Sequence, residues 1–359
     1  MAPVNATLGL VVERGSANRL LWNQTEGLEG VHRTPEGVFR VQAGWEGADH
    51  LLVFGTPIPE DGGVRPTRAQ RWARKIGFVS EHDDIRRRCD LAWRRLLDQS
   101  GLERERVSCL FYEPPSLVSD AAYLSAHAHA GRVFGPDDRA GVCTRLPAMW
   151  TLGESVRSLR TTPMPAKTMR LVCVTSGKAM TPGHEARLRF LRLLRDRGVP
   201  FDLFGRDLPS DLEGRGEISD KADVFDSAAF ALVLENDASG RHYVTEKLWD
   251  ALVCWCAPIY WGSRAADRMI PGESMIRLPD LEEGGVDTIV RALADPESYS
   301  SRVGAIEEAR TRTLGDLRMV EWARHKLMGF RRMSSIQGAG AWGLDEDASG
   351  PTGAGERSA

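Results

Sequence analysis

Short runs of apolar residues alternate with charged segments along most of the chain. In the first half, residues 6–13, 50–55 and 106–112 are mostly apolar and predict buried strands. The segment DDIRRRCDLAWRRLLDQS between the last two predicts a helix, with one apolar face among arginines: Ile85, Cys89, Ala92, Trp93 and Leu96. Strand, helix and strand in succession is typical of an α/β layered fold.

The same alternation recurs in the second half. Short apolar runs predict strands at residues 169–175, 201–204, 230–234 and 258–261. The segment HEARLRFLRLLRDRG predicts an amphipathic helix that ends at Gly198. Two further helical patterns lie at 284–294 and 315–333.

The segment from 156 to 168 interrupts the alternation, because it contains two prolines and has no periodicity, as expected of a linker. A chain of 359 residues also exceeds what one core usually serves. We therefore expect an N-terminal domain at 1–160, a C-terminal domain at 161–336 and a disordered tail at 337–359, rich in Gly, Ala and Ser. Two Rossmann-like α/β domains facing across a cleft fit this pattern, and ligands of such folds bind at the carboxyl ends of strands.

Charge and apolar run length exclude the simplest alternatives. A formal net charge of −3 gives no field to attract nucleic acid. No apolar run reaches the roughly 20 residues of a membrane helix, and the N-terminus lacks a signal peptide's pattern, so we expect a cytoplasmic protein without stable membrane insertion. Free thiols are expected for the six cysteines: Cys89, Cys109, Cys143, Cys173, Cys254 and Cys256.

In the stretch YVTEKLWDALVCWCAPIYWG, which follows the strand ending at Leu234, Thr245, Glu246 and Lys247 are consecutive. They place a hydroxyl and two charges at the start of an apolar helix pattern. Thr245 is a good N-cap, and a helix N-terminus with Lys247 in its first turn is a seat for phosphate. Glu246 would repel phosphate but suits the vicinal diol of a ribose, so the pair indicates a nucleotide. The alternative, a capped helix whose first-turn Glu complements the dipole, stays open on this pattern alone.

These residues also carry a family resemblance. LENDASGRHYVTEKLWDALVCWCAPIYWGS, followed by IPGESMIRLPDL, resembles the signature of family 10 glycosyltransferases, the α1,3/4-fucosyltransferases, and the chain looks like a bacterial-type member. VTSGKAMTPGHEARLRFLRLLRDRGVPFDLFGR is similar to the family's strand, Arg-bearing helix and next strand. The resemblance is dense from about residue 168 to 280 and implies a GT-B fold with GDP-fucose as donor.

Carried onto this chain, the resemblance implies a set of donor-binding residues: Arg187, Glu235, Asn236, Tyr243, Glu246 and Lys247. Arg187 and Lys247 would hold the pyrophosphate, and Glu246 the ribose. Leu234 and Met275 stand where the family has Phe, which affects packing rather than chemistry.

The catalytic base is expected in the first domain. In RVSCLFYEPPSL an apolar strand runs into Glu113, and two prolines end it at once, which holds the carboxylate at the strand's tip. The family's base lies in a similar E-[PS]-P-S setting, which implies Glu113. Weaker rivals are Glu26, Glu29 and Glu81, and Glu113 itself could be an exposed loop acid.

Little in the sequence indicates a metal site. The one Asp-x-Asp run, 345–347, lies in the low-complexity tail, so no cofactor is expected and a divalent cation would at most be stimulatory. His127 and His129 in SAHAHAG lack a nearby third ligand and are expected to pack or to line the cleft.

The sequence therefore predicts an inverting, metal-independent hexosyltransferase that moves fucose from GDP-fucose to a glycan hydroxyl. The resemblance implies an acceptor containing N-acetylglucosamine or galactose. Two alternatives stay open: a relative that uses another nucleotide sugar, and a non-catalytic protein that binds GDP or a glycan.

Overall fold

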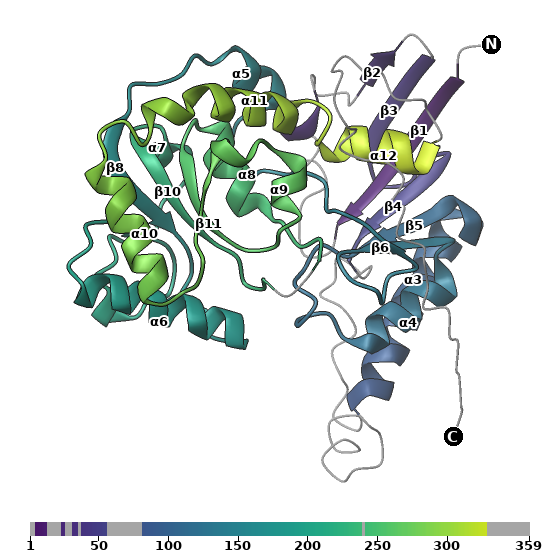
Figure 1. The fold of residues 1–359 in the computed structure, drawn as a ribbon. Coiled ribbons are helices and arrows are strands. Elements are labelled where there is room, and N and C mark those ends of the chain that lie inside the picture. The colour runs from purple at the N-terminus through teal and green to yellow at the C-terminus, as the bar shows by residue number, and fades with distance from the viewer. Residues whose placement is uncertain are drawn as a thin grey trace, which may run out of the picture.

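The computed structural model describes residues 4–12, 23–25, 31–34, 37–55, 81–238 and 241–328. They fold into two α/β domains, each with its own largely parallel sheet (Figure 1). This confirms the predicted fold class. The predicted tail, 337–359, lies outside the described residues.

The first sheet has seven strands in the order β2-β3-β1-β4-β5-β6-β7. Only the β2–β3 pair is antiparallel among its strand pairs. The strands are β1 (Val4–Val12), β2 (Val31–Thr34), β3 (Gly37–Ala43), β4 (His50–Phe54), β5 (Val107–Leu110), β6 (Arg132–Gly135) and β7 (Val142–Cys143). The sequence predictions at 6–13, 50–55 and 106–112 correspond to β1, β4 and β5.

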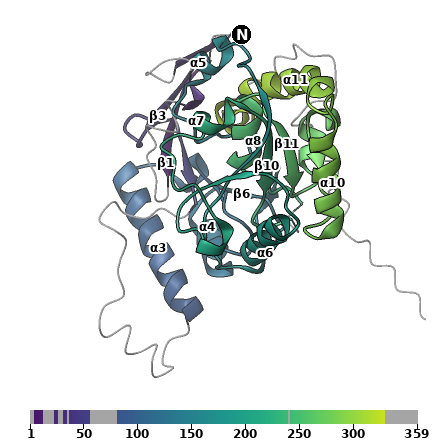
Figure 2. The same ribbon diagram turned by 90° about the vertical axis from the view of Figure 1, so that its left-hand side faces the viewer.

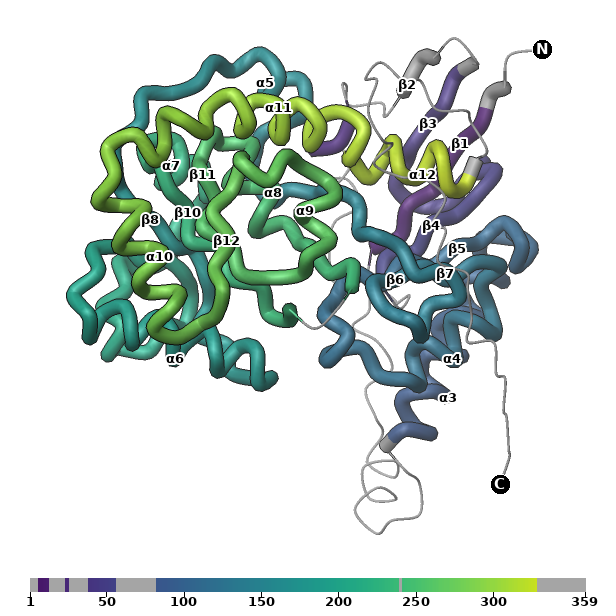
Figure 3. Tube along the Cα trace, in the orientation of Figure 1, coloured from purple at the N-terminus to yellow at the C-terminus, as the bar shows by residue number. Residues whose placement is uncertain are grey.

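Helices cover both faces of this sheet. On one face, α3 (Glu81–Ser100) and α4 (Asp120–His129) pack through Trp93 and Tyr123 onto β4, β5 and β6. The other face is covered by α12 (Met319–Met328), which comes from the far end of the chain. The ring of Trp322 on α12 packs edge-on against that of Phe134, with 5.0 Å between the ring centroids. Figure 3 follows the chain from the second domain back across to the first through α12.

The second sheet has five strands, all parallel, in the order β12-β11-β10-β8-β9. They are β8 (Thr168–Val174), β9 (Asp202–Phe204), β10 (Ala228–Leu234), β11 (Ala257–Trp261) and β12 (Ile276–Arg277). Side chains of β10 alternate between two cores: Phe230 and Leu232 face one, Ala231 and Val233 the other. A strand buried on both faces reads as a continuous apolar run, as this segment does.

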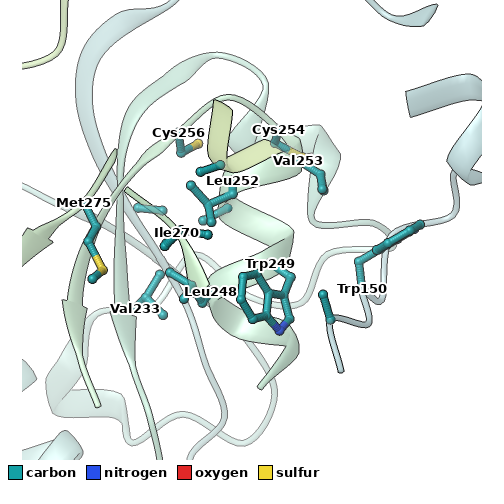
Figure 4. Packing of buried hydrophobic residues seen from close by; sticks show 14 of the residues in the cluster. Trp150, Val233, Leu248, Trp249, Leu252, Val253, Cys254, Cys256, Ile270 and Met275 are labelled. Atoms are coloured by element: carbon teal, nitrogen blue, oxygen red, sulfur yellow. The ribbon is translucent and has the colours of Figure 1, made fainter. Parts of the chain in front are cut away.

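Two helical layers enclose the second sheet (Figure 2). One contains α6 (Pro182–Asp196) and α10 (Glu283–Ala294), and the other contains α5 (Val156–Thr161), α8 (Glu246–Val253) and α11 (Val303–Leu314). Leu248, Trp249 and Leu252 of α8 pack in the second layer's core (Figure 4). The remaining short helical segments are α7 (Ala222–Phe225), α9 (Ala266–Met269) and 3₁₀ turns at Arg104–Arg106, Ser210–Leu212, Gly272–Ser274 and Ser300–Arg302.

Two helix predictions need correction. The segment at 156–168 is not wholly a linker: α5 forms because Ser155 caps Ser158 N at 3.2 Å and Val156 and Leu159 are buried. The pattern at 315–333 yields a helix only from Met319, and α11 before it was not predicted. The domain boundaries at 1–160 and 161–336 stay a prediction.

The cysteine prediction is confirmed, since all six thiols are free and only Cys143 is partly exposed. Among the described helices, none combines the length and the apolar character needed to cross a bilayer.

Candidate functional site

The candidate site lies at the carboxyl edge of the second sheet. Counted along the domain, the strand order is 2-1-3-4-5, so the connections run in opposite directions on either side of the β8–β10 pair. In open parallel sheets ligands bind outside the carboxyl ends of strands at such a switch point. Residues that follow β8 and β10, and the helices they enter, therefore form the expected binding edge.

Glu235 follows β10 directly and is fully buried. Its carboxylate accepts hydrogen bonds from Thr245 N at 2.8 Å and Thr245 Oγ1 at 2.7 Å. Burial raises the pKa of Glu235, against the opposing charge of Lys247. Both oxygens are used to fix the start of α8, so Glu235 shapes the site through Thr245.

The predicted N-cap is confirmed: Thr245 precedes α8 and its hydroxyl accepts from Lys247 N. Lys247 Nζ lies 3.1 Å from Thr245 Oγ1, 3.4 Å from Glu246 Oε1 and 3.5 Å from Glu235 Oε2. Its side chain is 17% exposed and that of Glu246 is 27% exposed. The ammonium group is thus held at the helix N-terminus and still reaches solvent.

The charges of this first turn support one another. Burial opposes ionisation of Glu246, but the charges of Lys247 and Lys221 outweigh it and lower the pKa of Glu246 to about 2. Burial also disfavours the Lys247 cation, yet Glu246 and Glu235 outweigh it and raise the pKa of Lys247. At neutral pH the site therefore presents a carboxylate beside an ammonium group, the pair needed for a ribose diol and a phosphate.

Arg187 comes to the same edge from α6. Its side chain is 2% exposed; Nη2 donates to Ser176 O at 2.9 Å and Nη1 donates to Asn236 Oδ1. Among the described residues, Arg187 Nε is buried without a hydrogen-bond partner. A buried guanidinium donor that is left unsatisfied costs free energy, so this side chain is suited to an anionic ligand.

The first turn of α6 presses against the loop after β10. A Cβ added at Gly183 would lie 1.9 Å from Asn236 O, so only glycine fits this approach. One residue on, His184 is buried, and its Nδ1 lies 2.6 Å from Thr181 Oγ1. Burial, and then the charges of Arg187, Lys247 and Lys178, lower the pKa of His184 to about 4. The N-termini of α6 and α8 thus converge on one electropositive region.

A small pocket opens between the ends of β8 and β10. Its volume is about 10 Å³, room for one water-sized group, and its lining includes Thr175, Lys221, Phe225 and Lys247. Thr175 Oγ1 is buried with no hydrogen-bond partner among the described residues. The pocket therefore adds an unsatisfied hydroxyl to the two ammonium groups.

Lys221 belongs to a buried network behind Glu246. Asp250, one helical turn after Glu246, is fully buried and pairs with Lys221 Nζ at 2.5 Å. It also accepts from Thr151 N at 2.7 Å and Thr151 Oγ1 at 2.8 Å. Asp250 thereby ties α8 to the segment that enters the second domain.

Two tyrosines, one from each domain, connect the site to the first domain. Tyr243 precedes α8 but packs in the core of the first domain, where Tyr112 lies at the margin. Burial, followed by the charges of Glu246 and Glu235, raises the pKa of Tyr112. Burial and the charges of Glu235, Glu246 and Glu113 raise the pKa of Tyr243. Glu113 is exposed and follows β5 by three residues, and its charge contributes to the raised pKa of both tyrosines.

The other predicted residues lie elsewhere. His127 and His129 are on α4, where their rings contact the carbonyls of Arg139 at 2.8 Å and Ser125 at 2.9 Å, so they pack. Glu81 begins α3, while Glu26 and Glu29 lie outside the described residues. In the part of the chain that the structure describes, no three His, Cys, Asp or Glu side chains group as metal ligands do.

The structure adds residues that sequence reasoning missed: Thr175, His184, Lys221 and Asp250. Two of them carry a local signal, since Thr175 directly follows β8 and Asp250 lies four residues after Glu246 on α8. Lys221 and His184 lack such a signal, because folding alone brings them to the edge.

A segment of the second domain matches a family model. Residues 164–298 match the model described as "Glycosyltransferase family 10 (fucosyltransferase) C-term". No curated relative matches the chain. The matched segment contains every donor-binding residue that the resemblance implied.

Solved structures offer weaker likenesses. An α1,3-fucosyltransferase is 13% identical, with a TM-score of 0.44 over 84% of this chain and 81% of that one. An α1,3-fucosyltransferase with GDP-fucose is 15% identical, with a TM-score of 0.38 over 84% and 82%. Anabaena Alr3699/HepE in complex with UDP is 10% identical, with a TM-score of 0.49 over 90% and 99%.

With TM-scores below 0.5, none of these likenesses decides the activity of the chain. The match at 164–298 instead confirms the resemblance read from the sequence. Residues 164–298, which lie in the second domain, are thus similar to the C-terminal part of the family 10 fucosyltransferases.

Proposed function

We propose that this chain transfers fucose from GDP-fucose to a glycan hydroxyl, with inversion at the anomeric carbon. The observation that carries the proposal is the electropositive edge of the second sheet. There Arg187 and Lys247 lie beside the N-terminus of α8, within the segment that matches the fucosyltransferase family.

The donor half of the site would bind GDP through its charges. The unpaired Nε of Arg187, the ammonium of Lys247 and the positive end of the α8 dipole suit the diphosphate. Glu246, ionised at neutral pH, would accept hydrogen bonds from the two ribose hydroxyls. These cationic groups also stabilise the charge that develops on GDP as it leaves.

The acceptor half would supply the base. The acceptor oxygen attacks the anomeric carbon, the bond to the β-phosphate oxygen breaks, and its electron pair leaves with GDP. Glu113 would take the acceptor's proton. Its carboxylate is exposed, and its charge contributes to the raised pKa of Tyr243, which precedes α8. The acceptor is proposed to contain N-acetylglucosamine or galactose.

A glycan panel with GDP-fucose tests the proposal, with products analysed for linkage and anomeric configuration. In the same assay, Glu113→Gln should lower kcat by about 10²-fold and leave GDP affinity unchanged, because the base does not touch the donor's nucleotide. Glu103→Gln is a matched control, since this exposed acid of the first domain makes no capping hydrogen bond. Turnover of Glu113→Gln at the wild-type rate would remove Glu113 from the role.

Two alternatives predict other outcomes. A relative with a different donor would use GDP-mannose or a UDP-sugar in preference to GDP-fucose in a competition assay. A non-catalytic protein would bind GDP without transferring or slowly hydrolysing any donor. The pair of Glu113 and an electropositive edge favours the enzyme, since binding alone does not need the acid.

A further inference from the structure

Arg139 holds the loop that carries Glu113. This loop runs from the end of β5 to the start of α4, and Arg139 lies in the turn between β6 and β7. Arg139 Nη2 donates to Pro115 O at 2.6 Å, and Nη1 donates to Val118 O at 2.7 Å. One guanidinium group therefore binds two backbone carbonyls of the loop within five residues of Glu113.

Two carboxylates fix the guanidinium group itself. Asp137 Oδ2 accepts from Nε at 3.1 Å and from Nη2 at 2.7 Å, and Asp120 Oδ1 accepts from Nη1 at 3.0 Å. Asp120 is the first residue of α4, so the loop's far end is bound as well. The planar guanidinium group binds several partners at once, so Arg139 has little conformational freedom. A lysine could not make the same set of hydrogen bonds.

The residues that precede Glu113 are also connected to Arg139, through two aromatic rings. The guanidinium carbon of Arg139 lies 4.6 Å from the centroid of the Tyr123 ring. That ring packs on Phe111, with a centroid separation of 4.2 Å. Phe111 is two residues before Glu113 and Pro115 is two residues after it, so both flanks of the acid are connected to Arg139.

We propose that Arg139 is a positioning residue for Glu113, an inference that rests on the proposed function. Glu113 is exposed and its side chain has no fixed partner of its own among the described residues, so its backbone must supply the orientation. A general base works only within hydrogen-bond reach of the proton it removes, and small displacements of such a group reduce turnover. Arg139 orients Glu113 through the backbone of the loop and is not itself one of the reacting groups.

The test compares Arg139→Ala and Arg139→Lys with Arg104→Ala. Arg104 is a matched control, because it also binds two carbonyls in the same domain, Ala130 O at 3.2 Å and His127 O at 2.8 Å, at the opposite end of α4. Arg139→Ala should lower kcat by about 10-fold, with Arg139→Lys between it and wild type. The Kd for GDP should stay unchanged in all three variants, since none touches the donor half.

A double-mutant cycle with Glu113→Gln separates positioning from a general loss of structure. If Arg139 acts through Glu113, Arg139→Ala should cost nothing further in kcat once Glu113 is Gln. Equal kcat in Arg139→Ala and Arg104→Ala, or additive losses in the double variant, would overturn the proposal. If Arg139→Ala does not fold, Arg139→Lys takes its place in the same cycle.

Failure of the proposed function can be told apart from failure of the positioning role. If wild-type protein transfers no fucose to any acceptor, the fault lies with the function. If wild type is active and Glu113→Gln is impaired while Arg139→Lys behaves as wild type, only the positioning role is lost.

Discussion

Glu235 and Glu113 each follow a buried parallel strand, β10 in the second domain and β5 in the first, yet their surroundings differ. Glu235 is fully buried with both oxygens bonded to Thr245, whereas Glu113 is exposed and is placed through the backbone of its loop. The proposed donor half is thus preorganised by side chains packed into the fold. The proposed acceptor half keeps its acid exposed, as an incoming hydroxyl would require.

The largest effect should come from removing Glu235. Glu235→Ala leaves the Thr245 N–H and Lys247 without their buried partner, which should cost about 3–5 kcal/mol of folding free energy. Thermal or urea unfolding would measure the loss. Glu113→Gln serves as the comparison and should change stability by less than about 0.5 kcal/mol. Equal losses at the two positions would erase the distinction between the two halves.

A smaller effect is expected at Lys247. Lys247→Met keeps the stem of the side chain but removes a charge-assisted contact worth about 1.5–3 kcal/mol, so GDP should bind roughly 10- to 100-fold more weakly. Calorimetric titration with GDP measures this. Arg192→Ala is a suitable control, because Arg192 forms an ion pair with Asp211 on the surface. GDP affinity unaffected by loss of Lys247 would contradict the assigned electropositive edge.

Acid sensitivity should depend on Lys221. The pKa of Glu246 is lowered to about 2 from an ordinary value of 4.5, so its contribution to stability is complete above pH 4.5 and is lost as pH falls toward 2. Lys221→Met removes one of the charges that lower this pKa and also leaves the buried Asp250 carboxylate without its ion-pair partner. The variant should therefore be less stable at neutral pH, and its acid unfolding midpoint should rise by about one pH unit. His184, with a pKa lowered to about 4, destabilises both proteins equally on protonation. Circular dichroism between pH 6 and 2 would show the shift, and coincident curves would count against the role of Lys221.

The smallest effect is expected from removing metal ions. Because Arg187 and Lys247 already neutralise the proposed leaving group, EDTA should change kcat by less than about two-fold. Adding Mg²⁺ or Mn²⁺ back after chelation is the control. A large loss restored by one cation would mean that the edge is completed by a metal ion.

The two halves also differ in how far sequence predicts them. In the second domain, the apolar runs that became β10 and β11 are buried on both faces, as are Leu171, Val172 and Cys173 of β8, so their strand character is plain. Thr245, Glu246 and Lys247 are consecutive, and local capping rules were enough to place them at a helix start.

Features that depend on long-range contacts could not be predicted in this way. Lys221 meets Asp250 across 29 positions of sequence, and Tyr243 packs in the core of the other domain. Arg139 binds the carbonyl of Pro115, 24 positions away in the sequence, and no periodic pattern predicts this contact. The helix α5 was missed because its two buried residues, Val156 and Leu159, make too short a pattern beside the prolines.

The course of α12 has a consequence for protein engineering. Arg132 Nη2 donates to Leu327 O at 3.0 Å, and Met319 N donates to Gln24 Oε1 at 3.0 Å, so the last described helix is part of the first domain's packing. A chimaera that exchanges donor specificity between relatives must therefore be spliced twice, once before β8 and once between α11 and α12. A single crossover would bring a foreign α12 onto a sheet it did not evolve to cover.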